Sequence, residues 1–109
     1  MSLLVMRMDK RVPAIRSAAA ETVGRRVRDL RLELGVSQEG LAELAGLHWS
    51  FVGQTERGLR NLTLHNLVKL ADALGVDPSE LVRDLTVADL PSESHEPSAT
   101  ERIREQRRR

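Results

Sequence analysis

The stretch that decides the fold is SQEGLAELAGLHWSFVGQTERG, residues 37–58. Ser37 is a strong helix N-cap, and Leu41 and Leu44 follow it as the apolar positions of a short helix. Gly46 and Gly58 each stand where a helix is expected to end, because glycine adopts the left-handed conformation without steric cost. The spacing therefore predicts two short amphipathic helices, over 37–45 and about 48–57, that are separated by a tight turn.

Three further helices are predicted around this pair, and no segment alternates with the period of a β-strand. The first covers roughly 22–34 and ends at Gly35, and residues 14–21 are a possible backward extension of it. Another starts after Thr63 and ends before Gly75. The last is short and opens with Asp77-Pro78-Ser79-Glu80, which supplies an N-cap, a proline at the first helical position and an early glutamate. The residues expected to face the core of the first and fourth helices are Val23, Val27, Leu30, Leu34, Leu67, Leu70, Ala71 and Leu74.

This pattern divides the chain into three parts. Residues 1–20 form a mixed leader whose true start is open, because Met6 and Met8 follow Met1 closely. Residues 21–87 form an all-α domain of five helices. Residues 88–109 are expected to be a polar linker and a basic tail that ends in three arginines.

Composition excludes several classes of function. The chain has 109 residues, no cysteine and two aromatic rings (Trp49 and Phe51), so thiolate metal sites and base-stacking surfaces are not expected. No segment approaches the roughly 18 apolar residues of a membrane helix or the secretory pattern, and we expect a cytoplasmic protein. No nucleophile stands beside a base, and the histidines at 48, 65 and 95 are dispersed. We therefore expect no enzyme, metal site or cofactor.

Two short helices joined by a glycine turn, the second with a polar and aromatic outer face, are typical of a helix-turn-helix. In that motif the first helix crosses the phosphates and the second enters the major groove. The segment 23–82 resembles the Cro/repressor-type (XRE) family, through the runs at 28–31, 35–42, 45–47, 52–58, 60–64 and 70–76. GQTERG and RNL, at 53–58 and 60–62, are most similar to the controller proteins of restriction–modification systems. The resemblance implies a five-helix lambda-repressor-like domain with flexible tails at both ends.

The resemblance also implies which side chains read DNA. The family's glutamine that bonds a phosphate or an adenine edge corresponds to Gln38, and the first outward positions of the recognition helix correspond to Trp49 and Ser50. A later outward position is Gln54, whose amide suits adenine N6 and N7. Trp49 departs from the family pattern of glutamine, arginine or a small polar residue. Its ring can contact a thymine methyl, lie along the sugar-phosphate wall, fill a partner's pocket or cover the edge of the core.

Other residues are expected to stabilise the fold or to bind phosphates. Arg31 and Glu56 match a family pair that forms a buried salt bridge between the first and third helices. Phe51 is expected to pack beside Leu47. The residues expected to meet phosphates at either end of the recognition helix are His48, Arg57, Arg60 and Asn61.

The charge of the domain favours specific over non-specific binding. Residues 22–85 hold eight Lys/Arg and nine Asp/Glu, a net charge of −1. A protein that coats DNA without sequence preference would be far more basic, whereas a specific regulator needs only a polarised surface and a few phosphate contacts.

We therefore predict a sequence-specific transcriptional regulator that binds double-stranded DNA as a homodimer. One domain offers too few base contacts, so two copies are expected on a pseudo-palindrome with half-sites about 34–36 Å apart. The expected dimer surface is Leu81, Val82 and Leu85, because the last helix has more apolar residues than it can bury alone. RNA polymerase is a further candidate partner, and neither a membrane nor a small-molecule ligand is expected. The alternative function is an antitoxin or protein-interaction adaptor that uses the same fold.

Overall fold

Five consecutive α-helices form the body of the computed structural model, which describes residues 17–91 and 99–108. They are α2 (Ala18–Leu34), α3 (Gln38–Ala45), α4 (Trp49–Glu56), α5 (Leu64–Leu74) and α6 (Ser79–Val82). A 3-10 turn, η1 (Val87–Asp89), and a separate helix, α7 (Ala99–Arg108), follow. The two described ranges contain no strand, and the fold is all-α, as the sequence predicts.

Local capping explains where these helices begin. The Oγ of Ser37 accepts a hydrogen bond from the Gly40 amide at 2.9 Å, and the Oγ1 of Thr63 accepts one from the Asn66 amide at 3.1 Å. Both starts are confirmed. α2 begins before residue 22, within the possible extension over 14–21: the Oγ of Ser17 accepts from the Ala20 amide at 3.0 Å, and the helix begins at Ala18. Alanine is the strongest helix former, which lets this first turn extend the apolar pattern backwards.

The short α6 is fixed at both ends by polar contacts. At its start, the Oδ1 of Asp77 accepts from the Ser79 amide at 2.8 Å, and this hydrogen bond lowers the pKa of the Asp77 carboxyl. At its end, the Nη1 of Arg26 donates to the Leu81 carbonyl oxygen at 3.1 Å. An arginine of α2 therefore anchors the final helix to the body of the domain.

The buried core lies between α2, α3, α4, α5 and α6. Its apolar members are Val23, Val27, Leu41, Ala42, Ala45, Val52, Leu70, Ala71, Leu74 and Leu81. Two predicted core positions are wrong, because Leu34 and Leu44 are 46% and 60% exposed. In α2 the inward position one turn after Val27 is taken by Arg31, and in α3 the buried face passes through Ala42 and Ala45.

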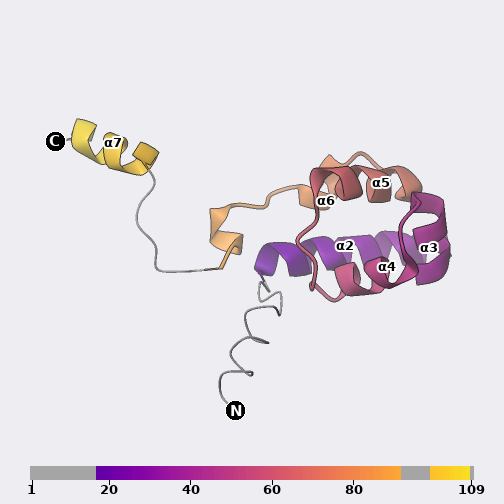
Figure 1. Cartoon of the computed structure of the whole chain (residues 1–109). Coiled ribbons are helices and arrows are strands. Elements are labelled where there is room, and N and C mark those ends of the chain that lie inside the picture. Colours follow the sequence, from indigo (N-terminus) through magenta and orange to yellow (C-terminus); the bar gives the residue numbers. More distant parts are fainter. Residues whose placement is uncertain (1–16, 92–98, 109) are drawn as a thin grey trace, which may run out of the picture.

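The backbones of α2 and α4 approach closely, and the two helices run side by side in Figure 1. A Cβ atom on Gly24 of α2 would lie 2.3 Å from the carbonyl oxygen of Thr55 in α4. That distance is impossible for a real side chain, so only glycine lets the two backbones meet here. In the same view α3 closes one end of the pair, and α5 and α6 lie on the other side of the domain.

The segment after α6 contains a 3-10 turn that is capped by its own side chains, and it contributes no fully buried residue to the core. Thr86 and Asp89 form a reciprocal capping box around η1. The basic tail contains the ten-residue α7, a helix that composition did not predict, and none of its residues is buried. No helix of the described ranges is long and apolar enough to cross a membrane. Of the predicted leader at 1–20, residues 1–16 lie outside the described residues, and residues 18–20 belong to α2.

Candidate nucleic-acid interface

The turn between α3 and α4 presents the first residues of α4 to solvent. Gly46 ends α3 with a φ of 71°, and the Leu47 amide donates to the Ala42 carbonyl at 2.9 Å. His48 then caps α4, because its Nδ1 accepts from the Ser50 amide at 3.2 Å. An accepting Nδ1 requires the ring proton on Nε2. The imidazole that was expected to touch a phosphate therefore also fixes the start of α4.

Trp49 is the most exposed aromatic side chain on this surface. Its side chain is 61% exposed and stacks on the His48 ring, with ring centroids 5.6 Å apart. The ring does not cover the edge of the core, which removes one of the four roles open to it. The neighbouring Phe51 is half-buried and packs against the core.

The inner side of α4 is held by a buried ion pair. Arg31 Nε donates to Glu56 Oε2 at 2.6 Å and Nη2 donates to Glu56 Oε1 at 3.0 Å, while Nη1 donates to the Val36 carbonyl at 3.0 Å. The two charged side chains are only 10% and 4% exposed. The hydrogen bond to Glu56 raises the pKa of Arg31 despite burial, which opposes the charged form. The bridge that the sequence resemblance implies is thus formed.

Gln38 joins this inner network instead of standing free. Its Nε2 donates to Glu56 Oε1 at 3.0 Å, and its Oε1 lies 3.2 Å from where a Cβ on Gly53 would be. The Nη1 of Arg57 is 3.4 Å from the same point. The amide and the guanidinium therefore lie together over Gly53, where the absence of a side chain makes room for them.

The outer side of α4 carries a second arginine contact, which sequence reasoning missed. Arg60 Nε donates to Gln54 Oε1 at 2.8 Å, and the guanidinium lies 4.9 Å from the centroid of the Phe51 ring. Arg60 lies beyond the end of α4, so no helical spacing connects it to Gln54 or Phe51. The feature of the sequence that could have indicated this contact is Gly58. Its φ of 76° turns the chain back along the helix.

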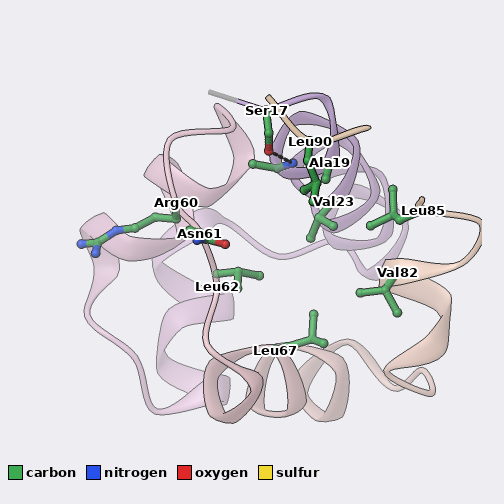
Figure 2. Close-up of a pocket in the computed structure, with 11 residues that line it drawn as sticks. Ser17, Ala19, Val23, Arg60, Asn61, Leu62, Leu67, Val82, Leu85 and Leu90 are labelled. Carbon is green, nitrogen blue, oxygen red and sulfur yellow. Dashed lines mark hydrogen bonds between the residues drawn. The ribbon is translucent and has the colours of Figure 1, made fainter. Parts of the chain in front are cut away.

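Residues of the expected dimer surface are divided between the core and a cavity. Leu81 is 0% exposed, so its assignment to the dimer surface is wrong: it completes the core of its own domain. Val82 and Leu85 line a cavity of about 180 Å³ between the start of α2, the segment before α5, and α6 (Figure 2). Arg60 and Asn61 also line it, and the end of the Arg60 side chain extends away from it in the same view.

Comparison with known proteins identifies the family. A model of the family HTH_3, described as helix-turn-helix, matches residues 27–81. The chain belongs to this helix-turn-helix family. Its members are DNA-binding transcriptional regulators rather than enzymes, so the exposed surface of α4 belongs to a DNA-binding regulator.

Individual relatives show which group within the helix-turn-helix family the chain is similar to. The control protein C.BamHI of Bacillus amyloliquefaciens is 40% identical over 67 residues, which are 61% of this chain and 83% of that protein. The control protein C.SmaI of Serratia marcescens is 42% identical over 62 residues, 57% of this chain and 74% of that protein. The chain is thus most like restriction–modification controllers, as the GQTERG and RNL runs indicate.

Solved structures agree with the lambda-repressor-like architecture. The restriction–modification controller protein C.AhdI from Aeromonas hydrophila is 52% identical, with a TM-score of 0.56 over 57% of this chain and 94% of that one. The P22 c2 repressor, solved in complex with a synthetic operator, is 30% identical with a TM-score of 0.54 over 56% of this chain and 92% of that one.

Proposed function

We propose that this regulator reads a pseudo-palindromic operator as a homodimer, with α4 in the major groove. The observation that carries the proposal is the division of α4 into two sides. Val52 and Glu56 fix one side to the domain, and the other side presents Ser50, Gln54 and the returning Arg60. Trp49 is exposed at the first turn of the helix. A recognition helix needs this division, since its outward side chains must reach base edges while its inward ones hold the angle of entry.

The test of this function is selection of bound duplexes from a random pool. We expect an inverted repeat whose half-sites are about one helical turn, 34–36 Å, apart. A selected sequence without the repeat would contradict the homodimer. No enrichment at all would contradict DNA binding and favour the adaptor, the alternative function for this fold.

The dimer is expected to form around the apolar residues beside the cavity. Val82 is 39% exposed although it is apolar, and Leu85 is half-buried next to it. Val82→Asp should therefore yield monomers in sedimentation at tens of micromolar and leave the helical signal intact. Leu44→Asp is the matched control, because Leu44 is also an exposed aliphatic residue but lies on α3. A wild type that sediments as a monomer would contradict the dimer, and a Val82→Asp variant that remains dimeric would show that the interface is misplaced.

Arg57 is proposed to bind a phosphate. It is exposed, and it lies over Gly53 beside Gln38 without a carboxylate partner among the described residues. Arg57→Ala should weaken operator and random duplex alike and lower the salt slope by about one unit, because one fewer counterion is released. A change in sequence preference with an unchanged slope would make Arg57 a base reader.

Trp49 is proposed to contact a thymine methyl, the apolar group that the major groove offers to an exposed ring. Deoxyuridine differs from thymidine only by that methyl. Replacing the relevant thymine by deoxyuridine should weaken binding of the wild type and leave binding of Trp49→Ala unchanged. If every such replacement is silent in the wild type, the ring has another role.

A further inference from the structure

The contact between Gln54 and Arg60 changes what this part of the surface can recognise. The Gln54 side chain has one amide oxygen, which accepts, and one amide nitrogen, which donates. Arg60 Nε donates to this oxygen at 2.8 Å and takes up one of its two lone pairs. The charged donor beside it leaves the Gln54 nitrogen as the group with which this side chain can meet a base.

Arg60 also retains donors after making this contact. A guanidinium has five N–H groups in a fixed plane, and the Nε–H alone is used on Gln54. No described residue accepts a hydrogen bond from its Nη1 or Nη2. Gln54 and Arg60 together therefore present mainly hydrogen-bond donors, and the remaining lone pair of the Gln54 oxygen lies beside the guanidinium charge.

The major groove distinguishes purines by this property. Adenine presents the N7 acceptor beside the N6 amino donor, whereas guanine presents N7 and O6, which are both acceptors. A surface on which charged donors predominate matches guanine. The adenine amino group would instead face a guanidinium, which has no acceptor to offer it and carries positive charge.

We propose that Gln54 and Arg60 form one reading unit for guanine, and that Phe51 is its positioning residue. This replaces the adenine contact expected for Gln54 alone and the phosphate contact expected for Arg60. The proposal rests on the proposed function, since it requires α4 to lie in the major groove.

Phe51 explains how an exposed arginine keeps a defined direction. Its ring is half-buried against the core and lies 4.9 Å from the Arg60 guanidinium carbon, a distance at which a cation is attracted to an aromatic face. The turn is held from behind as well, because the Leu59 amide donates to the Gln54 carbonyl at 2.9 Å. Ring, amide and turn together aim the Nη groups before DNA arrives.

The experiment uses base analogues in the operator selected from a random pool. At each guanine of a half-site, 7-deazaguanine removes the N7 acceptor, 2-aminopurine removes O6, and inosine keeps both. We expect one guanine at which the first two analogues weaken wild-type binding about tenfold or more, while inosine has little effect. A half-site with no such guanine overturns the proposal.

Variants of the full chain then assign the effect to the unit. Arg60→Ala should lose the sensitivity to both analogues, whereas the matched Arg57→Ala should keep it. Gln54→Glu retains an acceptor for Arg60, so guanine should remain preferred. The contrary outcome is a preference for adenine that persists in Arg60→Ala but is lost in Gln54→Glu. Gln54 would then read adenine by itself, and the proposal would be wrong.

The role of Phe51 is tested by measuring how strongly the guanine analogues weaken binding. If Phe51 only supported the fold, its replacement would not change this analogue effect. Phe51→Leu should reduce the analogue effect, and Phe51→Tyr, which keeps the ring, should restore it.

Other outcomes would contradict the reading unit. If Arg60→Ala weakens binding to all duplexes equally and lowers the salt slope by about one unit, Arg60 is a phosphate contact. A wild type that binds no duplex would contradict the proposed function itself, whereas operator binding that ignores the guanine analogues contradicts the reading unit alone.

Discussion

Two arginines hold α4 from opposite sides, and they do so with opposite chemistry. Arg31 reaches the inner side, where each of its three nitrogens donates to Glu56 or to the Val36 carbonyl. Arg60 reaches the outer side, where one nitrogen donates to the neutral amide of Gln54. Because Gln54 and Glu56 are two residues apart, their side chains point about 200° apart around the helix.

The difference shows how one type of side chain serves structure in one place and recognition in another. The inner arginine is nearly buried with its charge matched and with a hydrogen bond from each of its three nitrogens, so it can hold only this geometry. The outer one is exposed and keeps unsatisfied donors, so it can still bind something outside the protein. Burial and the count of remaining donors, rather than residue type, separate the two roles.

The largest expected effect comes from breaking the inner pair. Arg31→Ala leaves the Glu56 carboxylate buried without its partner, which should lower the free energy of unfolding by about 3–5 kcal/mol. Chemical denaturation measures the loss. The double replacement Arg31→Met with Glu56→Leu removes both charges and should recover most of the stability. A single variant as stable as the wild type would mean that the pair does not fix α4.

The next effect concerns the backbone contact on the same inner side. Gly24→Ala places a methyl 2.3 Å from a backbone oxygen that cannot turn aside, so α2 and α4 must separate. Overpacking of this kind costs about 1–3 kcal/mol. Gly40→Ala is the control, since its nearest contacts are side-chain atoms at 3.3 Å and 3.4 Å. Equal stability of the two variants in thermal unfolding would contradict the close approach.

The smallest effect on stability is expected from the outer arginine. Arg60→Ala removes only exposed contacts and should change the free energy of unfolding by no more than about 0.5 kcal/mol. The same denaturation experiment measures it beside Arg31→Ala. A loss comparable to that of Arg31→Ala would show that the outer contact also supports the fold, and the contrast between the two arginines would disappear.

The features that sequence could predict are those that depend on neighbours in the chain. Ser37 and Thr63 cap their helices through residues three positions away, so the starts of α3 and α5 were predictable. Leu44 and Leu81 were not, because burial depends on which element packs against them. An apolar residue on a four-residue helix fits a partner or a core equally well until Arg26 is seen to hold that helix to α2.

The candidate site follows the same rule. Trp49, Ser50 and Gln54 were found because helical spacing places them at the exposed start and side of α4. The contact of Gln54 with Arg60 was not found, since the chain reverses at Gly58 between them and helical periodicity ends there. Interactions across such a reversal are set by a single backbone conformation, which local pattern does not reveal.

Gly58 also sets the terms on which the specificity of this domain can be redesigned. Its φ of 76° and a space in which a Cβ would lie 2.7 Å from Glu21 Cγ leave no room for another residue. A combinatorial library must therefore keep this glycine fixed and vary positions 54 and 60 jointly. Screens that randomise the recognition helix alone would keep Arg60 beside every new side chain. They would therefore sample only part of the base preferences that this surface can provide.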